Sequence, residues 1–288
     1  FAENNKGSAL GNSAYYNSAV NFEKGGNLLS ALGMYAIVVQ FKGKQYQKLV
    51  RESRKSMIQI YERVGKYPEA AEAMESYAND FPTDPLYMDY IFNAAVIREG
   101  MRYYTAALRG YKIYLDKSKK ADRWEALFYM GRIWQDRNKY STAISYFEKY
   151  MNSPTRDKAR IMEAAFRIAT MYERLKNSKQ VDEWYNKIVR IFENFKKAGG
   201  SYGVKYAAEA KFNLVKGTYD ELRGLKIPKN PQRQGAIVQK KLALLDRLKE
   251  GLKQVVKFDD AYQVVAALTL QGQGLQHMSA ALYNAPAP

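Results

Sequence analysis

The sequence predicts an all-α fold, a right-handed α-solenoid of about five to six helical hairpins with a helical C-terminal cap. The first observation is a skeleton that returns five times: an aromatic residue, a small residue nine positions later, then large apolar residues four and seven positions further on. Self-similarity at a period of roughly 30 to 40 residues is typical of stacked helical hairpins. The second observation is composition, because 47% hydrophobic residues, 26% charged residues and only 8 prolines in 288 supply a continuous core without a sign of disorder.

The small residue of each copy marks where the two helices of a hairpin are expected to cross. These residues are Ala31, Ala70, Ala107, Ala143 and Val181, at steps of 39, 37, 36 and 38 residues. The copies are expected at about residues 12–45, 51–84, 88–121, 124–157 and 162–195, and together they form a repeat array over residues 1–195.

One copy shows the pattern most clearly, with Met130-Gly131, Trp134, Tyr140, Ala143, Phe147, Tyr150 and Pro154 in order. This pattern resembles the tetratricopeptide repeat, whose unit has about 34 residues. Each step here is a few residues longer, so we expect extended second helices or inter-repeat turns. The resemblance weakens at both ends, where Val181 replaces the usual alanine and Leu28 the usual tyrosine.

The resemblance implies which side chains bind a partner, since the first helix of each tetratricopeptide hairpin lines the concave face. The phase brings a mixed aromatic and polar set to this groove, suited to an extended peptide or a helix. The predicted partner-binding residues are Lys55, Gln59, Phe92, Asn93, Phe128, Tyr129, Arg132, Phe166 and Arg167. The same phase adds Glu23, Glu62, Glu99 and Gln135 to the groove.

Chaperone-binding members of the family grip a C-terminal carboxylate with three cations and two asparagines. In this chain Lys55 matches the first cation, whereas Glu125 and Tyr129 stand where the other two cations are needed. An acid and a phenol do not attract a carboxylate, so we do not expect this clamp. Asn93 still matches; it either holds a peptide backbone or is a polar surface residue.

The 24 tyrosines are predicted to be packing residues before they are a stacking surface for carbohydrate or nucleic acid. Eleven of them fall on the packing positions of the repeat, where the ring packs and the hydroxyl reaches water or the backbone. They are Tyr35, Tyr61, Tyr67, Tyr77, Tyr104, Tyr111, Tyr114, Tyr140, Tyr150, Tyr172 and Tyr185.

The residue inventory argues against an enzyme. Cysteine is absent, which excludes disulfides, thiolate metal sites and cysteine nucleophiles. His277 is the only histidine and lies in an expected helix without a carboxylate near it in sequence, so we interpret it as a structural or surface residue. Gly25-Gly26 and Gly199-Gly200 lack the pattern of a phosphate-binding loop. We therefore expect a non-enzymatic scaffold with no cofactor or metal.

Residues 196–288 are expected to form a basic helical extension. A loop at 196–200 precedes a helix over 202–223, the break at 227–232 precedes a helix over 235–258, and Asp259 and Asp260 can cap a last helix ending near Tyr283. This part resembles the end of tetratricopeptide proteins from Gram-negative bacterial envelopes, on the residues 207–215, 240–248 and 266–288. The resemblance implies a periplasmic or envelope location; the cytoplasm is the alternative.

Two roles are open for this extension. It either caps the solenoid and shields its last hydrophobic face, or it carries a docking tail of Asn284, Pro286 and Pro288 that enters a groove of its own or a neighbouring chain. The second role would give self-association. No stretch of about 18 apolar residues is present, so no segment is expected to cross a bilayer. The chain starts at Phe1, so we expect a mature form or a fragment.

Charge supports an alternative function. The formal net charge is +17, and residues 196–257 hold 15 basic and 5 acidic residues, whereas residues 258–288 hold no Lys or Arg. Such a surface could attract nucleic acid, anionic lipid or another polyanion, or it could be a solvated helix face. No nucleic-acid recognition motif is visible, so polyanion binding ranks below protein binding.

Overall fold

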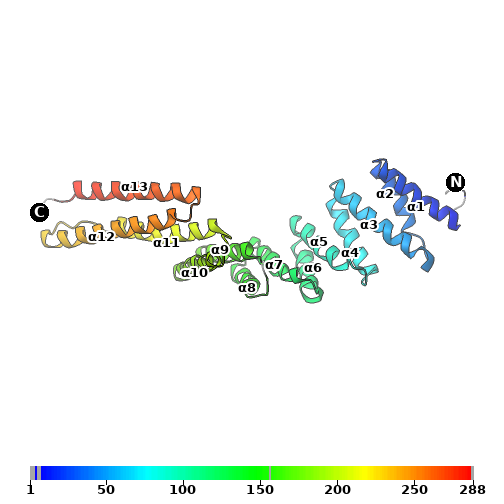
Figure 1. The fold of residues 1–288 in the computed structure, drawn as a ribbon, viewed down its shortest axis with the longest axis horizontal. Helices are drawn as coiled ribbons and strands as arrows, with labels where there is room; N and C mark the ends of the chain where they lie inside the picture. The colour runs from blue at the N-terminus through cyan, green and yellow to red at the C-terminus, as the bar shows by residue number, and fades with distance from the viewer. Residues whose placement is uncertain (1–3, 5–7, 156, 287–288) are drawn as a thin grey trace. The chain divides into compact units, whose positions relative to one another are not determined.

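The computed structural model describes residue 4 and residues 8–155 and 157–286. These residues form thirteen α-helices and two short 3-10 turns, with no strand among them (Figure 1). The chain divides into two compact units, Phe1–Ile133 and Trp134–Pro288. The predicted all-α class, built from tetratricopeptide-like helical hairpins, is confirmed.

The first unit contains three helical hairpins and the start of α7. Helices α4 and α5 pack together, as do α2 and α3, so each hairpin contacts the next one. The helices are α1 Ala9–Lys24, α2 Leu28–Val38, α3 Gln47–Arg63, α4 Tyr67–Asp80, α5 Tyr87–Gly100, α6 Tyr104–Lys117 and α7 Glu125–Asp136, with 3-10 turns at Lys44–Tyr46 and Ala121–Trp124.

Small residues let the two helices of each hairpin approach closely. Ala31, Ala70, Ala107 and Ala143 are all 0% exposed. Gly110 of α6 shows how tight this contact is, because a Cβ atom there would lie 2.8 Å from the Cβ of Ala95 on α5. The four alanines are therefore core residues, whereas Val181, the fifth residue of the predicted set, is only partly buried, and the crossing role stays a prediction.

The turn inside every hairpin has the same backbone geometry. The turn residues Gly26, Gly65, Arg102, Asn138 and Lys176 all have positive φ, between 56° and 78°. The amide of the following residue bonds the carbonyl five positions back, as in Asn27 N to Phe22 O at 2.8 Å and Lys66 N to Tyr61 O at 2.8 Å. This is a Schellman C-cap followed at once by the next helix.

Most of the predicted packing tyrosines are core. Tyr35, Tyr77, Tyr111, Tyr114, Tyr150 and Tyr185 are buried. Tyr61, Tyr104, Tyr140 and Tyr172 are partly buried, and Tyr67 is exposed, at 54%. It is the first residue of α4, beside the turn, so its ring lies beyond the hairpin contact and its assignment to the core was wrong.

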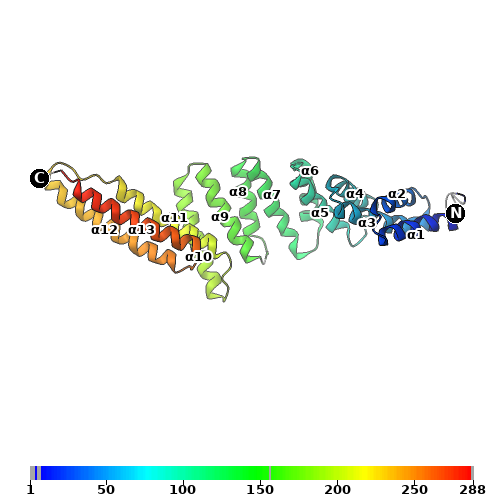
Figure 2. The ribbon, with the colours of Figure 1, turned by 90° about the horizontal axis from the view of Figure 1, so that it is seen from above.

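The second unit consists of one further hairpin, the helix α8 and three long C-terminal helices. The bounds are α8 Tyr140–Met151, α9 Lys158–Arg174, α10 Ser178–Lys197, α11 Val204–Gly224, α12 Pro231–Val256 and α13 Ala261–Tyr283. Helix α11 packs against α9 and α10 and also against α12 and α13. Figure 2 shows α11, α12 and α13 lying side by side.

The boundary between the two compact units falls inside α7 along the chain, whereas the sequence predicted a domain boundary at residues 195–196. The packing of α11 on the α9–α10 hairpin explains why these helices share a unit with the C-terminal helices. The sequence boundary stays a prediction, and α11 has the position of a cap on the last hairpin.

The three C-terminal helices share an apolar core around Leu222, Leu248, Leu252 and Val255, each at most 1% exposed. One charged residue lies in it: Lys241 of α12 is 0% exposed. Its Nζ donates to the carbonyl oxygens of Leu222 at 2.7 Å and Leu225 at 2.8 Å, at the end of α11. The ammonium therefore satisfies carbonyls that a helix end leaves without an intrahelical partner.

None of the helices in the described ranges is long and apolar enough to cross a membrane.

Candidate functional site

Helix α5 and the start of α7 bring the predicted groove aromatics of the first unit together. The ring centroid of Phe92 lies 4.8 Å from that of Tyr114 and 5.6 Å from those of Tyr111 and Tyr129. The rings of Tyr111 and Tyr129 stack at 5.3 Å with an interplanar angle of 14°. Tyr111 and Tyr114 are buried below, while Phe92 and Tyr129 are partly exposed. We call Phe92, Asn93, Tyr129 and Arg132 the α5–α7 patch.

Polar groups surround these rings. Asn93 is exposed next to Phe92. Arg132 Nη2 lies 3.0 Å from Glu99 Oε1, and the guanidinium carbon lies 5.3 Å from the Tyr129 ring centroid. Lys120 pairs with Asp89 at the start of α5. The patch thus combines two ring surfaces with an amide and a fixed cation.

The same hydrogen bond recurs within three of the hairpins and holds acids of the predicted groove in place. A tyrosine of the second helix donates to a glutamate twelve residues earlier, at the end of the first helix. The pairs are Tyr35 to Glu23 at 2.7 Å, Tyr111 to Glu99 at 2.6 Å and Tyr185 to Glu173 at 2.6 Å. In the other two hairpins the tyrosine position holds Met74 and Phe147, and residue 135 is Gln rather than Glu.

The sequence interpretation missed these pairs. It counted Glu23 and Glu99 among residues open to a ligand, whereas each accepts a hydrogen bond from its own hairpin. The spacing of twelve between a glutamate and a tyrosine was the signal that could have found them.

Burial and the acid partners raise the pKa of these phenols. Burial, together with the hydrogen bond and charge of Glu23, raises the pKa of Tyr35 to about 12. The pKa of Tyr111 is raised further, because Tyr111 is more deeply buried and faces Glu99. These hydroxyls therefore stay protonated donors at all ordinary pH values.

Lys55 and Gln59 of α3 are not part of the aromatic cluster around Phe92. Lys55 Nζ is 3.7 Å from Asp84 Oδ2 and 3.5 Å from Glu52 Oε1. Burial acts to raise the pKa of Asp84, but the Leu86 amide, the Tyr77 hydroxyl and the charges of Lys55 and Arg51 outweigh it and lower the pKa. Gln59 is exposed.

The remaining predicted partner-binding residues, Phe128, Phe166 and Arg167, do not belong to the α5–α7 patch. Phe128 is only 3% exposed, so its ring packs in the protein and offers almost no surface to a partner. In the second unit, the Phe166 ring centroid lies 5.3 Å from that of Tyr206. Arg167 bonds Glu163 Oε1 at 2.7 Å and Gln135 Oε1 at 3.1 Å.

The C-terminal tail contacts its own helix α12. The carbonyl oxygen of Pro286 accepts a hydrogen bond from Gln234 Nε2 at 2.8 Å. Asn284, just after α13, is exposed and donates to the Ala280 carbonyl at 2.8 Å. Pro288 lies outside the described residues.

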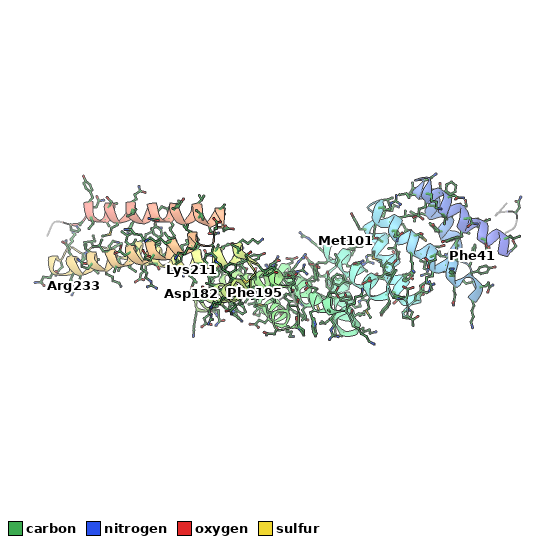
Figure 3. All side chains as sticks on the ribbon, viewed as in Figure 1. Phe41, Met101, Asp182, Phe195, Lys211 and Arg233 are labelled. Atoms are coloured by element: carbon green, nitrogen blue, oxygen red, sulfur yellow. The ribbon has the colours of Figure 1, made fainter. Side chains whose placement is uncertain are left out.

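A hollow of about 310 Å³ gathers part of the basic charge of the second unit. Phe192 and Phe258, with ring centroids 5.4 Å apart, belong to its lining. Lys196, Lys211 and Lys257 line it together with one acid, Glu193, and Figure 3 labels Lys211 on α11. None of these three lysines pairs with a carboxylate of the described residues. We call this the lysine hollow.

The described residues contain no group of three or more acidic or histidine side chains that could hold a metal ion.

Comparison with known proteins gives one family match. Residues 125–154 match the model of the tetratricopeptide repeat. Among solved structures, MamA is similar at 15% identity with a TM-score of 0.44, over 65% of this chain and 94% of that chain. YrrB, described as a tetratricopeptide protein with an unusual peptide-binding site, is similar at 17% identity with a TM-score of 0.44, over 66% of this chain and 89% of that chain. No curated protein matches the sequence.

The matched segment extends from the first residue of α7 to just beyond α8, and it is the copy that shows the sequence pattern most clearly. The resemblance to the tetratricopeptide repeat family that the sequence predicts is therefore confirmed.

Proposed function

We propose that the protein is a non-enzymatic interaction scaffold that binds a peptide or partner protein through the α5–α7 patch. The observation that carries the proposal is the pair of partly exposed rings, Phe92 and Tyr129, set over the buried Tyr111 and Tyr114. Aromatic and arginine side chains in preorganised, partly desolvated settings contribute most of the binding free energy at protein interfaces.

The chemistry of the patch favours a neutral segment with an apolar anchor. Arg132 is already paired with Glu99, so it offers little attraction to a ligand carboxylate. The exposed amide of Asn93 can both donate to and accept from a peptide backbone, while the two rings cover an aliphatic or aromatic side chain.

The test is affinity capture from native extract with the wild-type chain, three patch variants and one control variant. We expect Phe92→Ala and Tyr129→Ala to weaken binding of the captured partner by roughly 30-fold each, the size of an interface hot spot. Asn93→Ala changes an exposed side chain and should weaken binding without affecting stability. Tyr103→Ala is the matched control, because Tyr103 is exposed in the α5–α6 turn. Equal capture by all five chains would refute the proposal.

The docking-tail hypothesis also concerns this patch. A chain ending at Asn284 removes Pro286 and its bond to Gln234. If the tail competes for the patch, the shortened chain should bind the captured partner more tightly than the full chain. Unchanged affinity and an unchanged oligomeric state would refute the hypothesis.

Polyanion binding is a second candidate, favoured by the three lysines of the lysine hollow. The two phenylalanine rings and the excess of three lysines over the single Glu193 suit a phosphate or carboxylate attached to an apolar group. Binding of heparin that weakens after Lys196→Gln and Lys211→Gln, but not after Lys229→Gln on the exposed loop, would support it. If heparin binding is lost at modest salt in every variant, the binding is nonspecific electrostatic attraction.

We also propose an envelope or periplasmic location, from the sequence resemblance of residues 207–288 alone. Fractionation of the source cells tests it, and recovery in the cytoplasmic fraction would contradict it.

A further inference from the structure

Helix α13 has two apolar faces. One face packs on α11 and α12 through Ala267, Leu270, Gly274 and Met278, all buried. The other projects away from both helices (Figure 3). Six large side chains on this outer face have exposed fractions from 45% to 89%: Tyr262, Val265, Leu268, Leu275, Leu282 and Tyr283. The uncharged polar residues Thr269, Gln276 and Ser279 are exposed among them. A helix that is apolar on both sides is expected to be covered on both.

The outer residues follow a heptad repeat. Leu268, Leu275 and Leu282 are seven residues apart, and Val265, Gly272 and Ser279 each lie three positions before one of them. Two positions repeating every 3.5 residues on average form the seam through which one α-helix packs along another. The stripe is therefore shaped for a helix.

Packing within one chain does not explain why residue 272 is a glycine. A Cβ atom at Gly272 would meet nothing within 4 Å, whereas one at Gly274 would lie 2.8 Å from Leu248. Glycine inside a helix costs about 1 kcal/mol relative to alanine. Packing within the bundle accounts for Gly274, while Gly272 lies on the outer stripe, where a second helix could approach closely.

Charge favours an identical partner. The net charge is +17, so two copies repel each other over most of their surface. Helix α13 contains no Asp, Glu, Lys or Arg, and the Thr269 hydroxyl donates to the Val265 carbonyl at 2.9 Å within the helix. Two copies of this face can meet without charge repulsion, whereas an acidic or basic partner would find nothing to pair with.

The exposed area is sufficient for a dimer. Taking about 200 Å² for a fully exposed large side chain, the six side chains offer roughly 750 Å² per copy. Stable interfaces bury about 600 to 1,000 Å² per partner, so the area of this face lies within their range.

We propose that α13 is a dimerisation helix, which pairs with α13 of a second copy along the stripe of Leu268, Leu275 and Leu282, with Gly272 at the crossing. Residue 272 is the midpoint of Ala261–Tyr283, so the two glycines come close in both the parallel and the antiparallel pairing. The α5–α7 patch lies in the other unit, so the proposal does not depend on it.

The first experiment is sedimentation equilibrium on the full chain from about 1 µM to about 100 µM. We expect the wild type to reach twice the mass of one chain and Leu268→Glu/Leu275→Glu to stay monomeric with unchanged helix content. Gln273→Glu/Ala280→Glu adds two charges at the same spacing to exposed positions beside the stripe, and should dimerise as the wild type does.

The second experiment uses the absence of cysteine in the chain. Gly272→Cys should form an interchain disulfide under mild oxidation, since its Cα can come within bonding reach of its counterpart. Ala280→Cys, exposed but off the stripe, should not. A wild type that is monomeric throughout, a dimer that survives Leu268→Glu/Leu275→Glu, or a monomer that binds phosphatidylglycerol vesicles through this face would each overturn the proposal.

Discussion

At the scale of single residues, the Lys241–His277 contact links stability to pH. Lys241 Nζ lies 3.2 Å from His277 Nε2. Burial lowers the pKa of His277, and the charges of Lys241 and Arg223 lower it further; burial lowers the pKa of Lys241 as well. These three groups come from three different helices, with Arg223 from α11, Lys241 from α12 and His277 from α13.

The sign of the pH effect follows from His277. The unfolded imidazole takes up its proton near pH 6.5, before the folded one does, so acid favours unfolding. The stability that neutral His277 contributes is present above about pH 6.5 and is lost as the pH falls below it. Urea unfolding midpoints at about pH 7.5 and about pH 5 should fall more for the wild type than for His277→Gln. Equal losses in both chains would contradict the prediction.

A second prediction concerns the tyrosine–glutamate pairs. Tyr111→Phe removes the donor of a 2.6 Å bond to the buried Glu99, which should lower the free energy of unfolding by about 1.5 to 3 kcal/mol. Tyr35→Phe is the matched comparison, because Glu23 is only partly buried and can turn to water. The free energy of unfolding, measured in urea, should fall less for Tyr35→Phe than for Tyr111→Phe. The reverse order would show that burial of the glutamate is not the cause.

The candidate site could be predicted from sequence only in part at this scale. The repeat phase correctly placed the predicted residues on α3, α5, α7 and α9, the first helices of their hairpins. It could not show that Phe128 is buried, because helical phase gives a direction and not the depth of packing around it. It also could not show which acids are already bonded, since those bonds depend on contacts between helices.

At the scale of helices, the shared turn geometry leads to a third prediction. Lys176 adopts φ 56°, a left-handed conformation that costs a residue with a Cβ about 1 to 2 kcal/mol, whereas the equivalent Gly65 adopts it freely. Lys176→Gly should therefore stabilise the chain by about 0.5 to 1 kcal/mol in urea unfolding. Asn138→Gly is the control: asparagine tolerates this conformation, so the gain should be smaller.

Sequence predicted the helices better than their ends. The long helix expected from residue 235 begins instead at Pro231, with the Asn230 side chain accepting from the Gln232 amide at 2.9 Å. The prolines at 228 and 231 read as a break, yet proline is well suited to the first helical turn. The helix expected from residue 202 begins at Val204, after Gly203 in a left-handed conformation.

At the scale of the whole molecule, charge outweighs individual ion pairs. Several of the ion pairs join exposed side chains, as in Lys253–Glu250, where both side chains are 66% exposed. Such pairs contribute little to stability, about 0 to 1 kcal/mol each. With a net charge of +17, the positive side chains repel one another throughout the chain, and this repulsion is greatest among the basic residues 196–257.

Salt should therefore stabilise this protein. Raising NaCl from about 20 mM to about 300 mM shortens the screening length from about 20 Å to about 6 Å, and we expect the thermal unfolding midpoint to rise. If the lysine hollow binds anions, sulfate at matched ionic strength should raise the midpoint further, and Lys211→Gln should reduce that excess. Lys229→Gln removes the same charge from an exposed loop and should leave the excess unchanged. If the midpoint falls as NaCl is added, the surface ion pairs contribute more to stability than the repulsion costs. If sulfate and chloride have equal effects, the lysine hollow does not bind the anion.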